Sequence, residues 1–194
     1  MKKLISKAIN KILSSRGDVD EVEVARKIGV KIGKDCVIHD NAITVFNTEP
    51  YLITIGDHVL IAHGVRFLPH EGAVWCLRGM EEEYKKMDCF APINVGNNVM
   101  LGMNSIIMTG VKIGNNVIVG AHSVVTKDIP DNSVVGGIPA KVICSIEEFK
   151  EKLPTSKKVL APTKSMSAEE KKEYLMKHYP EWFSIDTGDK NDSN

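Results

Sequence analysis

The sequence has no excess of either charge, since 25 lysines and arginines balance 25 aspartates and glutamates over 194 residues. Zero net charge offers no broad basic surface, so we expect no nucleic-acid partner. The chain also lacks an apolar run long enough to cross a bilayer. Residues 1–17 start with lysines but have neither a continuous apolar core nor a cleavage site, so we expect no secretory signal there.

Cysteine is sparse and scattered, and no CxxC pair is present. This pattern predicts free thiols in a protein of the reducing cytoplasm. The four residues concerned are Cys36, Cys76, Cys89 and Cys144. The length predicts one domain with short appendages.

What the sequence has instead is a repeat of six residues. Residues 95–130 divide into VGNNVM, LGMNSI, IMTGVK, IGNNVI, VGAHSV and VTKDIP, and each block begins with Val, Leu or Ile. The fifth residue is small or β-branched, and the third and fourth include many turn residues such as Asn and Gly. A period of six fits neither a helix nor a single half-buried strand. It predicts short strands joined by turns, three blocks to a triangular coil, with the coils stacked as parallel strands.

These blocks resemble the hexapeptide repeat of acyltransferases that fold as a left-handed parallel β-helix. The resemblance implies an all-β fold and a left-handed coil, a sense that spacing alone does not predict because most parallel crossovers are right-handed. On the repeats alone, a solenoid without catalytic activity, such as a scaffold or assembly subunit, stays open as an alternative.

The chain is expected to have three parts. Residues 1–29 form an N-terminal helical cap, residues 30–144 form the β-helix, and residues 145–194 form a helical extension with a disordered end. The repeat is lost over about residues 68–92, which are too long for a turn and predict an extruded functional loop. The coil between Ile38 and Ile55 is one residue short of three blocks, so it is expected to be irregular.

Local patterns refine the two ends. Apolar residues within positions 4–13 recur at helical spacing with lysines opposite, which predicts a capping helix, with peripheral membrane contact as the alternative. Ser145 with Glu148, and Ser167 with Glu170, match the capping box that begins a helix. We therefore predict one short helix after each serine.

Acetyl transfer from a thioester to a hydroxyl group needs a base, and histidine is the usual base at neutral pH. Of six histidines, His70 in FLPHEG lies where the extruded loop begins. It matches the catalytic histidine of similar sugar and polysaccharide O-acetyltransferases, so the resemblance implies that His70 is the general base. His63 is its nearest rival, and Glu71 or another carboxylate is expected to orient the imidazole.

The resemblance also implies a site for acetyl-CoA as co-substrate. The backbone amide of Met103 corresponds to the donor that polarises the thioester carbonyl, a contact typically worth roughly 3 kcal/mol of barrier. Small residues one coil later allow pantetheine to lie against the coil, and lysines near the final coils can pair with phosphates. The cofactor-binding positions implied in this way are Gly102, Gly120, Ala121, Thr126, Lys127 and Lys141.

The acceptor side is implied more loosely. The segment NTEPYLITIGDHVLIAHGVRFLPHEGAVW resembles O-acetyltransferases of capsule, exopolysaccharide or lipopolysaccharide synthesis, with a free-sugar or xenobiotic acetyltransferase as the alternative. Asn47, Glu71 and Trp75 are the candidate acceptor contacts, although burial of Trp75 against the coil is an equal alternative. Family members place their sites between subunits, so the resemblance implies a homotrimer.

No metal is expected to be required. γ-Type carbonic anhydrases share this fold and bind zinc through histidines, and His58 and His63 have the spacing of two such ligands. Their register is wrong, however, because the second ligand position would fall on Leu68, which cannot bind zinc.

Overall fold

The structure is a computed structural model that describes residues 19–154 and 160–183. The chain divides after Glu151 into two compact units. The helix expected within residues 4–13 and the end expected to be disordered lie outside the described residues. Within the described ranges, no helix has the length and apolar character needed to span a membrane.

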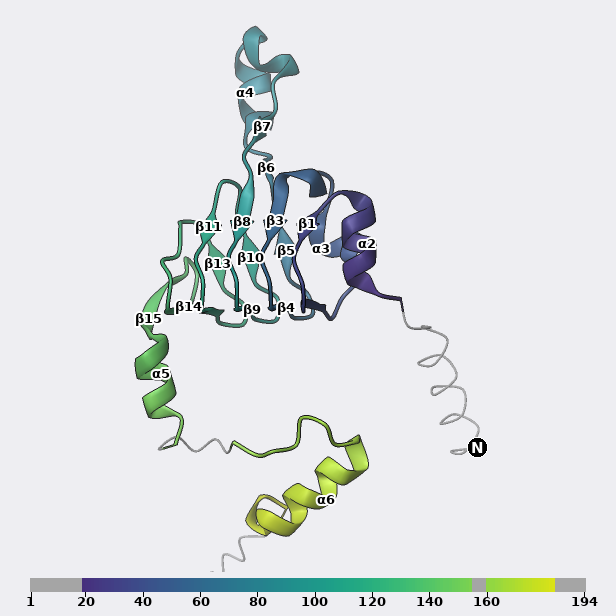
Figure 1. The fold of residues 1–194 in the computed structure, drawn as a ribbon. Helices are drawn as coiled ribbons and strands as arrows, with labels where there is room; N and C mark the ends of the chain where they lie inside the picture. Colours follow the sequence, from purple (N-terminus) through teal and green to yellow (C-terminus); the bar gives the residue numbers. More distant parts are fainter. Residues whose placement is uncertain (1–18, 155–159, 184–194) are drawn as a thin grey trace, which may run out of the picture. The chain divides into compact units, whose positions relative to one another are not determined.

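The first described element is the helix α2 (Glu21–Ile28). Asp20 caps its first turn, because its side chain accepts hydrogen bonds from the amides of Val22 and Glu23. Gly29 ends it in a left-handed conformation with φ of 111°. The helix lies at one end of the coil (Figure 1), within residues 1–29, where a helical cap was predicted.

Three sheets of short parallel strands form the body of the first unit. The first sheet contains β1 (Lys31–Ile32), β3 (Ile53–Ile55), β8 (Ile93–Val95) and β11 (Lys112–Ile113). The second contains β2 (Val37–Ile38), β4 (Val59–Ile61), β9 (Val99–Leu101), β12 (Val117–Val119), β14 (Ser133–Gly136) and the antiparallel β15 (Lys141–Ser145). The third contains β5 (Arg66–Phe67), β10 (Ile106–Ile107) and β13 (Val124–Val125).

The chain passes from the first sheet to the second and then to the third, and each coil stacks on the one before it (Figure 1). Val99 pairs with Val117, and Ile106 pairs with Val124, so the register repeats every 18 residues, or three blocks. Block-starting residues such as Leu101, Ile107 and Ile113 are buried in the core. The period read from the sequence is therefore confirmed as the period of a three-sided coil.

The turns of successive coils stack into three corners. The asparagine corner joins the first sheet to the second and comprises residues 33–36, 56–58, 96–98, 114–116 and 131–132. The Met103 corner joins the second sheet to the third and comprises residues 62–65, 102–105 and 120–123. The arm corner joins the third sheet to the first and comprises residues 68–69, 91–92, 108–111 and 126–128.

The asparagine corner shows why polar residues recur in the repeat. Asn98 and Asn116 adopt φ of 55° at equivalent turns, a conformation that Asn tolerates better than most residues. Asn98 Nδ2 donates to Asn116 Oδ1 at 2.9 Å, and Asn116 Nδ2 donates to Asn132 Oδ1 at 2.8 Å. His58 Nδ1 lies 2.9 Å from Asn98 Oδ1 at the start of the same ladder. The side chains thus connect successive coils along this edge.

The coil that was expected to be irregular holds two short helical turns, α3 (Ala42–Phe46) and the 3-10 turn η1 (Pro50–Leu52). Phe46 of α3 is fully buried and stacks on Phe67 of β5 with ring centroids 5.2 Å apart. This contact fixes the irregular segment against the strand that leads to His70.

The extruded loop forms an arm that projects from the coil at the arm corner (Figure 1). A two-stranded hairpin, β6 (His70–Glu71) with β7 (Cys89–Phe90), forms its base. Beyond the hairpin lie α4 (Val74–Met80) and the 3-10 turn η2 (Glu82–Lys86), neither of which has a buried residue. We refer to residues 70–90 as the arm.

Both helices predicted from capping boxes are present. Ser145 and Glu148 exchange backbone-to-side-chain hydrogen bonds of 3.0 and 3.1 Å at the start of α5 (Ile146–Lys152). Ser167 and Glu170 form the same box before α6 (Ala168–His178) in the second unit. A 3-10 turn, η3 (Pro180–Trp182), follows α6. All four cysteines are free thiols, as expected.

Candidate active site

His70 is the first residue of β6 and faces a carboxylate from the irregular coil. Its Nδ1 lies 2.8 Å from Oε2 of Glu49, and the side chains are 39% and 15% exposed. Thr48 Oγ1 donates to the same carboxylate oxygen at 2.5 Å and lies 3.3 Å from His70 Nδ1. No described residue makes a hydrogen bond with Nε2. The imidazole is therefore held through one nitrogen and offers the other to the outside.

The environment of Glu49 favours its ionised form. Burial alone would raise its pKa, but hydrogen bonds from Thr48 and His70, together with the charge of His70, outweigh burial and lower the pKa. An ionised carboxylate accepts a hydrogen bond from a protonated Nδ1 and so selects the tautomer with a free Nε2. This arrangement suits a histidine that takes a proton from a bound hydroxyl group.

The backbone on both sides of this pair is constrained. Asn47 ends α3 with φ of 59° and ψ of −138°, a conformation outside the usual left-handed region, which turns the chain towards Thr48 and Glu49. On the other side, Pro69 O accepts hydrogen bonds from Ala91 N and from Thr109 Oγ1, each 3.1 Å long. These bonds fix the base of the arm directly before His70.

At the Met103 corner a backbone donor is exposed. Gly102 is buried and packs so tightly against residues 119–121 that a Cβ there would lie 2.6 Å from Ala121 N. Met103 is 49% exposed, and its N–H makes no hydrogen bond to any described residue. Ala121 occupies the equivalent exposed position one coil later, since His122 N donates to Met103 O. Gly102 is thus tightly enclosed, and the neighbouring amide of Met103 has no partner among the described residues.

A single chain does not bring His70 and Met103 together. Met103 lies before β10, at the Met103 corner, whereas His70 lies beside Thr109, which follows β10 at the arm corner. The third sheet separates the two positions. His70 and Met103 therefore lie at different corners of the same coil.

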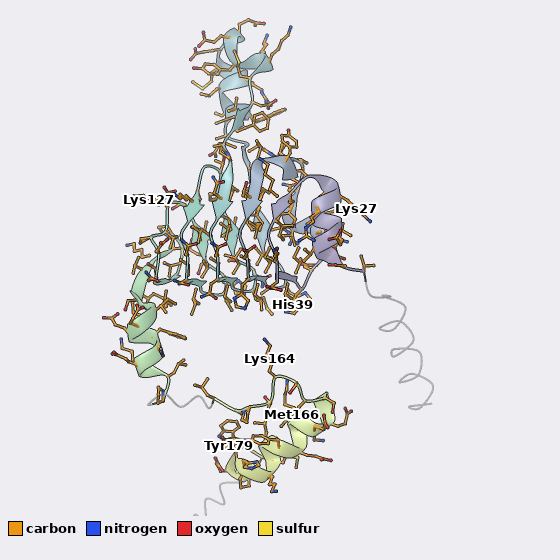
Figure 2. The ribbon with its side chains drawn as sticks, in the orientation of Figure 1. Lys27, His39, Lys127, Lys164, Met166 and Tyr179 are labelled. Atoms are coloured by element: carbon orange, nitrogen blue, oxygen red, sulfur yellow. The ribbon has the colours of Figure 1, made fainter. Side chains whose placement is uncertain are left out.

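The other expected coenzyme A residues divide between the same two corners. Thr126 and Lys127 are exposed at the arm corner, and Figure 2 shows Lys127 on the edge that carries the arm. Lys141 pairs with Gly136 at the start of β15 and lies near Gly120, because Gly120 N donates to Val135 O. All three side chains are free to contact phosphates.

The three candidate acceptor residues lie in different places. Asn47 is exposed two residues before Glu49, and Glu71 follows His70 on β6. Trp75 lies on α4 and is 76% exposed. Burial of Trp75 against its own coil, the alternative kept open from the sequence, is therefore wrong.

The two histidines considered as zinc ligands do not lie at the same corner of the coil. His58 lies at the asparagine corner, whereas His63 lies at the Met103 corner and stacks on His39 with ring centroids 5.7 Å apart. Across residues 19–154 and 160–183, no group of three or more His, Cys, Asp or Glu side chains could hold a metal ion. This placement gives no support to the carbonic anhydrase alternative.

Glu49 is the residue that sequence reasoning missed, since Glu71 was the carboxylate named. It lies 21 positions before His70, so no local spacing connects the two. One signal was available in the sequence. Glu49 belongs to the coil that is one residue short of three blocks, and a side chain in an irregular coil can point across a corner.

Comparison with known proteins identifies the family to which the chain belongs. Residues 92–127 match the family model described as bacterial transferase hexapeptide (six repeats). Protein CapG of Staphylococcus aureus is 48% identical over 181 residues, which cover 93% of this chain and 98% of that protein. The chain therefore belongs to the bacterial hexapeptide-repeat transferase family.

Two further relatives have described activities. Galactoside O-acetyltransferase of Escherichia coli is 39% identical over 125 residues, covering 61% of this chain and 55% of that enzyme. A hexapeptide-repeat acetyltransferase from Vibrio cholerae, solved in complex with acetyl coenzyme A, is 27% identical with a TM-score of 0.51. That match covers 74% of this chain and 87% of the other.

Proposed function

We propose that this protein transfers the acetyl group of acetyl-CoA to a hydroxyl group of a saccharide, in the synthesis of a capsular, extracellular or lipopolysaccharide polymer. The observation that carries the proposal is the 2.8 Å contact between His70 and Glu49 at the base of the arm. It lies on a coil whose relatives include a galactoside O-acetyltransferase and an acetyltransferase solved with acetyl coenzyme A.

In this proposal His70 is the general base. Nε2 takes the proton of the acceptor hydroxyl group. The oxygen of that hydroxyl group forms a bond to the carbonyl carbon of the thioester at the same time. Glu49 and Thr48 hold the ring at Nδ1, and the ionised carboxylate of Glu49 stabilises the imidazolium that forms. When the C–S bond breaks, the imidazolium returns the proton to the departing thiolate of coenzyme A.

The Met103 corner supplies the remaining catalytic contact. The free N–H of Met103 donates to the tetrahedral oxyanion, a contact typically worth roughly 3 kcal/mol of barrier. Gly102, Gly120 and Ala121 leave a smooth path for pantetheine. Thr126, Lys127 and Lys141 receive the nucleotide phosphates.

In this proposal, the separation of His70 from Met103 means that a complete site needs more than one copy. If His70 of one copy faces Met103 of the next, each copy meets one neighbour at its arm corner and another at its Met103 corner. Three triangular coils close such a ring, so we propose a homotrimer of left-handed coils with three sites between subunits. The third sheet, between those two corners, then faces the centre of the trimer.

The outer faces of the sheets support this arrangement. Ile106 and Val124 pair side by side on the outer face of the third sheet and are only partly buried in the single chain. Arg66 precedes them in the same row, and its guanidinium lies near Asp40, which follows β2. The corresponding outward residues of the first sheet, Thr54, Asn94 and Lys112, are polar and exposed. The apolar pair is suited to burial between subunits, and the polar face of the first sheet is suited to water.

Acetyl-CoA is a cytoplasmic metabolite, so we place the reaction in the cytoplasm. Among acceptor contacts we assign Asn47 and Glu71, which flank the catalytic pair, and exposed Trp75, whose indole suits stacking on a sugar face. A free sugar or a xenobiotic is the alternative acceptor.

The test is acetyl transfer by the purified full-length protein. Acetyl-CoA is incubated with monosaccharides, glycosyl phosphates and de-acetylated polysaccharide fragments, and acetylated products are measured by mass spectrometry. A product from a saccharide that disappears in His70→Ala supports the proposal. Transfer to a xenobiotic alcohol with none to any saccharide would favour the alternative.

A further inference from the structure

Four polar side chains gather beside the Met103 corner, away from the catalytic pair. His39 and Asp40 follow β2, His63 lies in the corner itself, and Arg66 begins β5. His39 and His63 are both exposed, and their rings stack at 5.7 Å with an interplanar angle of 29°. Arg66 Nη1 lies 3.6 Å from Asp40 Oδ2, and these side chains are 37% and 31% exposed. Figure 2 shows His39 on the lower edge of the coil, towards the end that carries α2. None of these four residues has a role in the mechanism above.

Both carboxylate oxygens of Asp40 accept hydrogen bonds from the protein backbone. Its Oδ2 accepts a hydrogen bond from Gly64 N at 3.0 Å, and its Oδ1 accepts one from Asn41 N at 2.9 Å. These backbone bonds are the main reason that its pKa is lowered, and Arg66 and His63 lower it further. Asp40 therefore fixes the turn beside His63 and offsets part of the charge of Arg66. Arg66 Nη1 also donates to Val65 O at 2.8 Å, which leaves its other guanidinium nitrogens and the two imidazoles available to a ligand.

The position of this cluster follows from the register of the coil. Asn104 N donates to His63 O at 2.9 Å, so His63 lies beside Met103, one coil nearer the N-terminus. Neighbouring strands are about 4.8 Å apart, so the His63 ring lies within reach of a molecule held at the amide of Met103. Ala121, which lies on the coenzyme A path, is on the opposite side of Met103. The acceptor must then approach the thioester from the His63 side.

We infer that His39, His63 and Arg66 bind an anionic oxygen group of the acceptor, so that the preferred substrate is a saccharide carrying a phosphate ester or a carboxylate. Arg66 supplies a permanent charge and several N–H donors, and each imidazole supplies one further donor. Charge-assisted hydrogen bonds of this kind are the strongest polar contacts that an exposed site can offer. The inference rests on the proposed function, because Met103 defines which side of the corner the acceptor occupies.

The test is calorimetric titration of the full-length protein after saturation with coenzyme A, which occupies the phosphate-binding lysines. Three probes share a hexose frame: glucose, glucose 1-phosphate and glucuronate. We expect at least one anionic probe to bind about tenfold or more tightly than glucose, as an added ionic hydrogen bond permits. The two anionic probes then distinguish a phosphate subsite from a carboxylate subsite.

Two variants connect the binding to the cluster. His63→Gln, at an exposed position, and Arg66→Met, which keeps the aliphatic stem, should each remove most of the preference for the anionic probe. His58→Asn is the matched control, because asparagine occupies the equivalent turns at Asn98 and Asn116, and it should keep the preference. Melting curves identify a variant that fails to fold, in which case the remaining variant decides.

The two proposals fail in different ways. Equal affinity for all three probes in the coenzyme A complex, or a preference unchanged in both His63→Gln and Arg66→Met, would overturn the anionic subsite and leave the acetyltransferase proposal standing. Absence of coenzyme A binding in the wild-type protein would overturn the proposed function.

Discussion

Glu49 Oε2 and His70 Nδ1 are 2.8 Å apart, although the residues are 21 positions apart in the chain and belong to different coils. Thr48 contacts both groups, and the lowered pKa of Glu49 keeps its carboxylate ionised at neutral pH. The pair therefore holds one ring nitrogen and exposes the other beside the arm. The first two predictions follow from this relationship.

His70→Ala should lower turnover by roughly a hundredfold to ten-thousandfold, the usual contribution of general-base catalysis. The coil, the assembly and the coenzyme A path do not depend on this side chain, so coenzyme A affinity should stay near wild type. Steady-state rates and calorimetry measure the two effects. His58→Asn, at a turn where asparagine already occurs, is the control and should keep full turnover. Normal turnover in His70→Ala would exclude this residue as the base.

Glu49→Gln should also slow turnover, by at least about tenfold, because an amide cannot stabilise the imidazolium as a carboxylate does. The pKa of Glu49 is lowered in the folded protein, so its charged form is present above that pKa and is lost as pH falls through it. The ratio of wild-type to variant rate should therefore be constant around neutral pH and shrink towards one only at acid pH. A ratio that shrinks as pH rises would contradict this role.

Ala121→Trp should abolish coenzyme A binding, since the bulky ring would fill the proposed pantetheine path at an exposed turn. Calorimetry with and without a chelator measures this, and the chelator should leave wild-type affinity unchanged. Ala168→Trp, exposed on α6 in the second unit, is the matched control. Loss of wild-type binding on chelation would favour a metalloprotein instead.

Ile106→Glu should weaken or abolish the proposed trimer, because it replaces one member of the apolar pair Ile106 and Val124 on the outer face of the third sheet with a carboxylate. Asn94→Glu makes the same addition on the polar face of the first sheet and should leave the assembly intact. Light scattering over a dilution series measures the mass. In the proposed trimer each site is shared between two copies, so turnover of Ile106→Glu should fall with the fraction of trimer. A wild-type monomer with full activity would exclude the shared site.

Asn116→Ala should lower the free energy of unfolding by about 2 kcal/mol, because two ladder hydrogen bonds are lost and alanine resists the φ of 55°. Asn116→Gly loses the same bonds without the backbone strain, so it should be about 1 kcal/mol more stable than the alanine variant. Urea denaturation of the two variants separates the two contributions. Equal stability would show that backbone strain at this turn is negligible.

The sequence by itself determined the coil. Inward residues such as Leu101 and Ile107 recur every six positions because a strand and a turn of fixed length bring the chain back to the core at that interval. The same local logic predicted the two C-terminal helices, since a capping box lies within four consecutive residues. It also located His70, because a break in a regular repeat marks the arm.

Only the tertiary structure decided the partners across coils and corners. Glu49 reaches His70 through an irregular coil whose direction depends on Phe46 stacking on Phe67, and no periodic pattern encodes that packing. His39 meets His63 for a similar reason, since β2 and β4 pair with an offset of 23 positions around the irregular coil, which places His39 opposite Ala62 and next to His63. The separation of His70 from Met103 depends on which corner each turn occupies. The period fixed which residues face the core, whereas the arrangement of the corners decided which exposed residues can act together.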